Sequence, residues 1–422
     1  MRHLARAALL ALCLAAPLGT ASADDTWEKI VPTLDRGEIT ALEALPGGDL
    51  LVAGSASVSD RSVTSGWIAR FKPEGEQVWS REFIGEAYSV LSHIYAEGDR
   101  IYVGGTHISK MVFEDDMTSF VAVLSLDGEF FWETTLSNPG HSISLPKFII
   151  SGNGDFLVRM TKSVTGKGGD RAFYARLSPD GTIKWTYDGI HTGQYYEDLP
   201  PLRSLVRDPN NAEIHNESPG PIVETDDGSL QLYINRVEMI TGVSEIGRCE
   251  VVSADGDALE DQECPHPEQA ELTIRNRVAP YAVMRLEPGF VFANEISVEK
   301  PAENGSPGWK WSYESEHRAG LTDAVLTPDG GLIGVGYSMP KDAGKMHGYD
   351  AVIFRLAPDG TELWSQEYAS PTRDIFARIV ALGEDRYAVA GHTGVNSSTG
   401  QWDPWLLILD GDGTTQSAVP QK

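Results

Sequence analysis

Tryptophan recurs along this chain on a regular grid, and the grid limits what the chain can fold into. The steps from Trp79 to Trp132 and from Trp132 to Trp185 are both 53 residues, and Trp311 lies 53 residues before Trp364. A glycine precedes tryptophan by four residues at Gly75/Trp79, Gly128/Trp132, Gly181/Trp185 and Gly360/Trp364. Such a period is typical of an array whose units bury their apolar faces against one another. The sequence therefore predicts a repeat architecture.

One period contains the pattern of four short strands. In residues 320–368, β-rich runs are separated by turns such as Pro328-Asp329-Gly330-Gly331 and Pro358-Asp359-Gly360. Asp-Gly and Gly-Gly between such runs form hairpin turns, because glycine tolerates the positive φ that these turns need. Four antiparallel strands in a period of about 40–50 residues are typical of a propeller blade.

The register of the repeat predicts an all-β, seven-bladed β-propeller with four antiparallel strands per blade. Glu260 occupies the tryptophan slot of the fourth blade, and the blade at about 266–316 is the least regular. The N-terminal strand with Trp27 should close the last blade beside residues 405–409, because ring closure removes an exposed sheet edge. We expect the repeated tryptophans to pack between blades rather than to bind a ligand.

Residues 1–23 have the form of a secretory signal peptide. Arg2 and Arg6 precede the apolar run 7–18, and Ala21-Ser22-Ala23 is a small-residue cleavage site. The apolar run is too short to anchor the chain in a bilayer. We therefore expect residues 24–422 to form a single exported domain, periplasmic or extracellular, soluble and monomeric, with no integral membrane segment.

The chain is strongly acidic and carries few cysteines. Its 34 Lys and Arg against 61 Asp and Glu give a net charge of −27, which argues against nucleic acid as a partner. Cys249 and Cys264 lie nearly symmetrically about the turn at Asp255-Gly256. Since export favours oxidation, the sequence predicts a cross-strand disulfide between them.

Loop lengths predict which face of the ring carries function. Turns between first and second strands and between third and fourth strands are short, whereas second-to-third loops are long. An insertion at about 191–217 lies on the same side as the long loops. Binding residues usually lie on such loops. We expect ligand-binding residues on this loop face and at the mouth of the central channel: His141, His191, Tyr195, Tyr196, Arg318, Asp323, Arg373 and Asp374.

Arg36, Glu38 and Tyr88 belong to the same rim, at the starts of innermost strands. The mixed charges of the rim could hold a small polar ligand or pair with one another, and pairing is the commoner outcome. Histidines also map to this face, with His93 alone expected inside a strand. They lack the spacing of a metal site, and no nucleophile motif occurs, so we assign neither a metal nor catalytic residues.

The segment Tyr349–Trp364 resembles the repeat of bacterial exported seven-bladed propeller proteins, and its Gly-x-x-x-Trp spacing is similar to PQQ-like (pyrroloquinoline-quinone) and SBBP-type repeats. The resemblance implies the fold over the mature chain, not an activity. Quinoprotein dehydrogenases of that superfamily imply eight blades, a bound calcium and an adjacent cysteine pair. This chain has seven repeats, and its cysteines are far apart in sequence. We therefore expect neither PQQ nor Ca²⁺ as a cofactor.

These observations favour an exported, non-catalytic propeller that binds a protein, peptide or glycan partner through its loop face. The alternative is an exported enzyme with its site at the mouth of the central channel. That enzyme would be a hydrolase or lyase, or less readily a quinone-dependent oxidoreductase.

Overall fold

The computed structural model describes residues 28–30, 36–57, 64–73, 75–85, 88–109, 117–138, 141–164, 170–188, 215–238, 244–259, 264, 282–283, 295–300, 308–314, 318–339, 348–368, 374–394 and 403–414. These residues form strands and turns and no helix, so the described part of the chain is all-β. No helix among them is long and apolar enough to cross a membrane.

The strands follow the short β-rich runs that the repeat predicts. Their bounds are β1 (Glu28–Ile30), β2 (Arg36–Ala44), β3 (Leu50–Ser57), β4 (Thr64–Phe71), β5 (Gln77–Phe83), β6 (Tyr88–Glu97), β7 (Arg100–Ile108), β8 (Met117–Ser125), β9 (Phe130–Leu136), β10 (His141–Ile150), β11 (Phe156–Val164), β12 (Asp170–Leu177), β13 (Ile183–Tyr187), β14 (His215–Glu224), β15 (Leu230–Glu238), β16 (Ser244–Val252), β17 (Ala282–Val283), β18 (Glu295–Lys300), β19 (Trp309–Glu314), β20 (Arg318–Leu326), β21 (Leu332–Met339), β22 (Asp350–Leu356), β23 (Glu362–Tyr368), β24 (Asp374–Gly383), β25 (Arg386–Thr393) and β26 (Asp403–Asp410).

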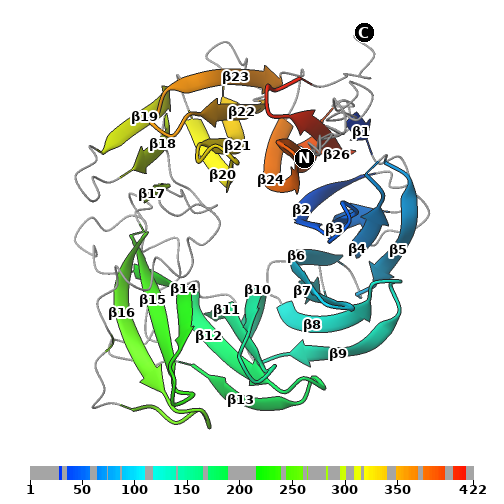
Figure 1. The fold of residues 1–422 in the computed structure, drawn as a ribbon. Helices are drawn as coiled ribbons and strands as arrows, with labels where there is room; N and C mark the ends of the chain where they lie inside the picture. Colours follow the sequence, from blue (N-terminus) through cyan, green and yellow to red (C-terminus); the bar gives the residue numbers. More distant parts are fainter. Residues whose placement is uncertain are drawn as a thin grey trace, which may run out of the picture.

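Consecutive strands pair antiparallel into small units. β10–β13 and β20–β23 each form a four-stranded sheet, and β2–β5 and β6–β9 are joined into one sheet by a single parallel bridge between Thr64 and Tyr88. β14–β16 and β17–β19 form three-stranded sheets. β1 pairs with β26, so the two ends of the described chain share the sheet β1-β26-β25-β24. Figure 1 shows these units following one another around a central axis, with β2, β6, β10, β14, β20 and β24 toward the centre.

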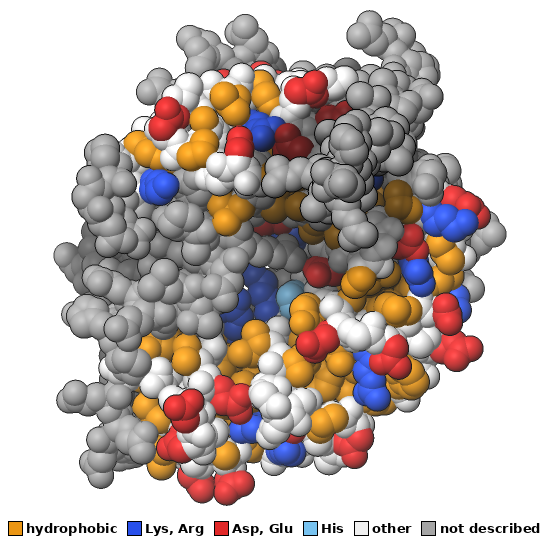
Figure 2. All heavy atoms as spheres, viewed as in Figure 1, with side chains coloured by type: hydrophobic (Ala, Val, Ile, Leu, Met, Phe, Trp, Pro, Cys, Tyr) orange, Lys and Arg blue, Asp and Glu red, His pale blue; other side chains and the backbone are white. Residues whose placement is uncertain are grey.

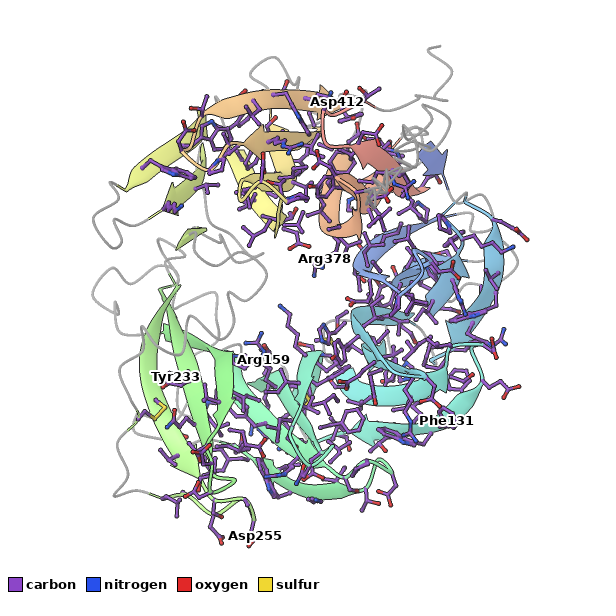
Figure 3. All side chains as sticks on the ribbon, viewed as in Figure 1. Phe131, Arg159, Tyr233, Asp255, Arg378 and Asp412 are labelled. Atoms are coloured by element: carbon purple, nitrogen blue, oxygen red, sulfur yellow. A yellow bond between two sulfur atoms is a disulfide. The ribbon has the colours of Figure 1, made fainter. Side chains whose placement is uncertain are left out.

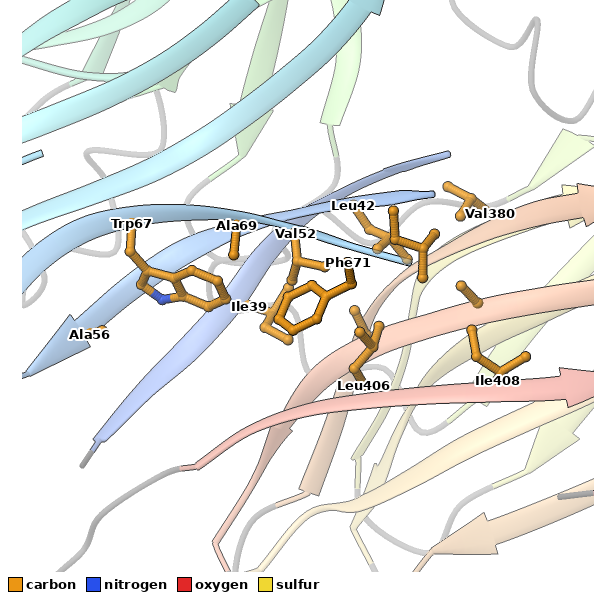
Figure 4. Packing of buried hydrophobic residues seen from close by; sticks show 13 residues of the cluster. Ile39, Leu42, Val52, Ala56, Trp67, Ala69, Phe71, Val380, Leu406 and Ile408 are labelled. Atoms are coloured by element: carbon orange, nitrogen blue, oxygen red, sulfur yellow. The ribbon is translucent and has the colours of Figure 1, made fainter. Parts of the chain in front are cut away.

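The hydrophobic core is divided into clusters that lie between neighbouring units. In Figure 4, Ile39, Val52 and Phe71 of the β2–β5 unit pack against Leu406 and Ile408 of β26, and all five are buried. Five further clusters join other neighbouring units in the same way. Each unit therefore finds much of its apolar contact on the next unit, as in other repeat arrays.

Each repeated tryptophan docks on a glycine turn of the next unit. Trp132 Nε1 donates a hydrogen bond to Pro179 O at 3.1 Å, and a Cβ added to Gly181 would lie 2.6 Å from the Trp132 ring. Gly181 has a φ of 85°, the left-handed region that favours glycine. The same contact recurs at Trp79/Gly128, Trp185/Gly256 and Trp364/Gly413. The prediction that the tryptophans pack between units is confirmed for these residues, whereas Trp27 lies outside the described residues.

Sequence analysis placed Trp311 in the tryptophan repeat, but the tryptophan that makes the repeated contact is Trp309, two residues earlier. Trp309 Nε1 donates to Pro358 O at 3.0 Å, and a Cβ on Gly360 would lie 2.5 Å from the Trp309 ring. Trp311 instead stacks on Phe354 with ring centroids 4.3 Å apart. Both residues face the neighbouring unit because side chains two positions apart on a strand share a face. Spacing alone therefore could not separate them.

Arginines reinforce the contacts at the turn ends of the units. Arg70 Nε donates to Asp49 Oδ2 at 2.7 Å, and its Nη1 donates to Leu126 O of the next unit at 3.0 Å. Arg176 and Arg355 make equivalent contacts with an aspartate and a turn carbonyl. The two sets of short turns therefore lie at one end of the units, which leaves the other end to the long loops.

The predicted disulfide between Cys249 and Cys264 is present, with Cα atoms 6.1 Å apart. Cys249 lies in β16 and Cys264 lies outside a strand, so the expected cross-strand geometry is wrong. Residues 191–214 of the predicted insertion at about 191–217 lie outside the described residues, and β14 begins at His215. Glu260 lies outside the described residues.

We predict that Gly181→Ala destabilises the protein more than Gly47→Ala does. Both glycines have positive φ, but a Cβ at Gly47 meets nothing within 4 Å, whereas one at Gly181 meets the Trp132 ring. Both variants should lose unfolding free energy because alanine is strained at positive φ, and the clash with Trp132 should add about 1–3 kcal/mol to the loss in Gly181→Ala. Urea unfolding would measure this difference. Equal losses of unfolding free energy in the two variants would show that the tryptophan contact adds nothing.

Candidate functional site

The innermost strands are linked to one another around the axis by polar contacts at a break in their register. β2, β6 and β20 are each irregular near their middle, where Thr40, Ser92 and Thr322 stand. Thr322 Oγ1 donates to Phe376 O of the next inner strand at 2.5 Å, and Ser92 Oγ donates to Pro146 O at 3.1 Å. Thr40 Oγ1 donates to Leu91 O in the same way. These β-bulges hold neighbouring inner strands together and aim the side chains beside them.

A group of cationic side chains lies near the axis at the level of these bulges. Lys147 of β10 and Arg378 of β24 follow the breaks in their strands, and Arg159 comes from β11. Figure 3 shows Arg159 and Arg378 pointing into the central space from different sides. Arg159 Nη1 donates to Gly220 O at 2.7 Å, which ties β11 to the next inner strand. All three cationic side chains are half-buried.

His93 lies beside this cationic group, which affects the pKa of its imidazole. Its ring packs edge-on against Phe148, with centroids 4.7 Å apart. Burial in the channel wall, together with the charges of Lys147, Arg159 and Arg378, lowers the pKa of His93 to about 3. The imidazole is therefore neutral at physiological pH.

A carboxyl and two hydroxyl groups form a second polar group, on the loop side of the bulges. Tyr88 OH lies 3.5 Å from Glu38 Oε1 and 3.3 Å from Ser55 Oγ, which itself lies 3.5 Å from Glu38 Oε1. Burial raises the pKa of Glu38, and the hydrogen bonds from Ser55 and Tyr88 only partly oppose it. Glu38 is half-buried, so it combines a raised pKa with access to solvent.

Two aspartates come close together where β22 and β24 begin. Asp374 is 2% exposed and accepts hydrogen bonds from Thr393 Oγ1 at 2.6 Å and Gly394 N at 3.3 Å. Burial, and then the charge of Asp374, raises the pKa of Asp350. Their environments differ, because Asp374 accepts two hydrogen bonds, whereas burial and the charge of Asp374 disfavour ionisation of Asp350.

Ser89, His107 and Glu133 are arranged in a row that superficially resembles a hydrolytic triad. Ser89 Oγ lies 2.7 Å from His107 Nδ1, and His107 Nε2 lies 3.8 Å from Glu133 Oε1. Ser89 is completely buried, and the His107 ring stacks on Phe120 with centroids 4.2 Å apart. A substrate cannot reach this serine, so the row is a structural contact among β6, β7 and β9.

The described residues include three of the eight predicted ligand-binding positions. His141 begins β10, Asp374 begins β24, and Asp323 stands in β20, where its Oδ2 accepts from Ile379 N at 3.1 Å. Only the backbone of Arg318, at the start of β20, is described. The other four, His191, Tyr195, Tyr196 and Arg373, lie outside the described residues.

The expectation that His93 is the only strand histidine is wrong, because His107 lies in β7 and His392 in β25, and His141 and His215 begin β10 and β14. Sequence analysis missed Asp350 and the cationic group, whose members come from three strands. Within the described ranges, no three His, Cys, Asp or Glu side chains are placed to hold a metal. A cavity of about 230 Å³ lies at the turn ends of β2, β20 and β24, lined by Glu43, Val325 and Ile379 among others.

We predict that His93 makes the protein sensitive to acid. An unfolded histidine takes up a proton near its ordinary pKa of 6.5, whereas the folded one does so near 3, so stability falls as the pH drops through that window. The slope should approach 1.4 kcal/mol per pH unit, an order-of-magnitude figure. Urea unfolding of wild type and His93→Gln at several pH values would measure it. If the unfolding free energy of the two proteins changed with pH in parallel, the prediction would be contradicted.

Comparison with known proteins gives structural likeness only. No protein-family model and no curated protein matches the chain. An ulvan lyase of polysaccharide lyase family PL25, bound to -[GlcA(1-4)Rha3S]-, is 12% identical with a TM-score of 0.41, over 90% of this chain and 95% of that one. The α-L-arabinanase of Penicillium chrysogenum is 11% identical with a TM-score of 0.39, over 89% and 93%. The β-propeller domain of the Trilobed protease from Pyrococcus furiosus is 8% identical with a TM-score of 0.40, over 92% and 99%.

An α-L-arabinofuranosidase from Fusarium graminearum and a Trypanosoma rangeli sialidase mutant also match, so the similar structures are mainly glycan-acting enzymes. The expectation of a non-catalytic binding protein is therefore wrong, and the alternative of an enzyme is favoured. The identities and TM-scores are too low to carry any one activity over to this chain. Its own residues decide which reaction it can perform.

Proposed function

We propose that this protein is an exported enzyme that hydrolyses glycosidic bonds on its loop face, with Glu38 as the general acid. The observation that carries the proposal is the raised pKa of a half-buried carboxyl at the inner rim of the ring. A protonated carboxylic acid suits glycoside cleavage, because the leaving oxygen must receive a proton as the bond to the anomeric carbon breaks.

The residues around Glu38 support this role. Burial keeps the carboxyl protonated to higher pH, and the hydroxyl groups of Tyr88 and Ser55 lie within 3.5 Å of the same oxygen, Oε1. Those contacts leave the orientation of the carboxyl well defined. Glu38 gives its proton to the leaving oxygen as the bond from that oxygen to the anomeric carbon breaks, a water molecule then bonds to the anomeric carbon, and the proton that this water loses returns to Glu38.

Asp374 begins β24, whose unit neighbours β2 through the shared hydrophobic cluster, and it accepts hydrogen bonds from Thr393 and Gly394. It is 2% exposed, so a substrate cannot reach it, and we assign it no part in the reaction. In this proposal neither PQQ nor Ca²⁺ takes part, because both proton transfers are made by Glu38.

The proposal includes the finer fold predicted from the sequence, a seven-bladed propeller. Divided at the Thr64–Tyr88 bridge, the sheets number seven units, and pairing of β1 with β26 would close the ring. Export as a monomer after loss of residues 1–23 belongs to the same proposal. The disulfide supports an oxidising compartment.

The test compares Glu38→Gln with Glu43→Gln, a matched change of another half-buried glutamate on the same strand. On a panel of neutral and acidic polysaccharides, release of reducing ends should fall by about 10²–10⁴-fold in Glu38→Gln, which loses the transferable proton. Glu43→Gln should keep its activity, and melting temperatures would confirm that both variants fold. No release by wild type from any glycan, or full activity of Glu38→Gln, would refute the proposal.

A further inference from the structure

The cationic group at the axis is unusual for a chain with a net charge of −27. Lys147, Arg159 and Arg378 belong to three different strands, yet all three charges act on the same imidazole, that of His93. Figure 2 shows Lys or Arg side chains and a His side chain at the floor of a central hollow. Positive charge is therefore gathered where the inner strands meet, although acidic residues predominate in the chain as a whole.

Backbone contacts hold two of these side chains in place. Arg159 Nη1 donates to Gly220 O, and Arg378 Nη1 donates to Ala377 O, both at 2.7 Å. Each of these contacts uses one of the five N–H donors of a guanidinium. Cationic groups that the fold holds in place pay less entropy when they bind a ligand.

Among the described residues that follow the register break of an inner strand, one is a carboxylate, Asp323, and backbone N–H groups orient it. Asp323 follows the break in β20 as Arg378 follows that in β24, and its two oxygens accept from Ala324 N at 3.0 Å and Ile379 N at 3.1 Å. The three cationic side chains outnumber this one carboxylate, so the net charge at the level of the bulges is positive. The lowered pKa of His93 agrees with that balance.

We propose that the central channel binds an oxyanion, a carboxylate, sulfate or phosphate group, between Lys147, Arg159 and Arg378. Guanidinium and ammonium groups form short, charge-assisted hydrogen bonds to such groups, and they do so best where water is partly excluded. This binding site goes beyond the proposed hydrolysis, because it uses none of the residues that surround Glu38.

The experiment titrates the protein with sodium sulfate, sodium phosphate or sodium acetate at constant ionic strength. Binding is followed by calorimetry and by the NMR signals of the His93 ring, and the three salts distinguish the oxyanion classes. At least one salt should give a saturable shift of the His93 signals. A bound anion should also raise the pKa of His93, because it offsets the neighbouring positive charges.

Lys147→Gln and Arg378→Gln should each weaken this binding by about tenfold or more, since each removes a charge-assisted contact. Arg100→Gln, a change of an exposed arginine at the start of β7, should leave it unchanged. Two channel variants are used so that one that fails to fold does not decide the test. The proposal is overturned if none of the three salts saturates, or if the folded channel variants bind as well as wild type.

Discussion

The fold depends on one contact that is repeated from unit to unit, the indole of an outer strand resting on a left-handed glycine turn. At Trp185 the ring meets Gly256, and its Nε1 donates to Ala254 O at 3.0 Å. In this contact the indole ring is removed from water and its N–H donates a hydrogen bond, and the ring can lie so close to the turn because glycine has no Cβ. Any side chain at the glycine would both strain the turn and push the neighbouring units apart.

Because the outer strands and the interunit cores hold the units together, the inner strands can carry polar residues. Besides their apolar contacts, the inner strands meet through bulged hydroxyl groups such as Thr322, whose Oγ1 donates to Phe376 O. A bulge redirects the next side chain, and this places Arg378 and His93 near the axis. The inner strands therefore contribute both to the interunit cores, through residues such as Ile39 and Phe376, and to the polar groups near the axis.

The sequence predicted the units well because glycine turns and tryptophans are local signals. It could not separate Trp309 from Trp311, since both side chains project from the same face of β19 and only the turn of the next unit selects between them. The cationic group was missed for a related reason. Lys147 and Arg378 are far apart in the chain, and the register breaks that bring them together leave no recognisable motif. Glu38 was placed on the rim, but its raised pKa depends on burial that a sequence does not show.

The two polar groups near the axis are electrostatically distinct, and this separation is what a glycoside hydrolase of the proposed kind needs. A cation close to Glu38 would favour the carboxylate and lower its pKa, which would remove the acid. Burial instead dominates at Glu38, with opposing contributions from the Ser55 and Tyr88 hydroxyl groups. At His93 the same physical effect, burial, acts together with three positive charges and keeps the imidazole neutral. The bulges thus allow the inner strands to hold a carboxyl group with a raised pKa toward the loop side and a cationic group deeper along the axis.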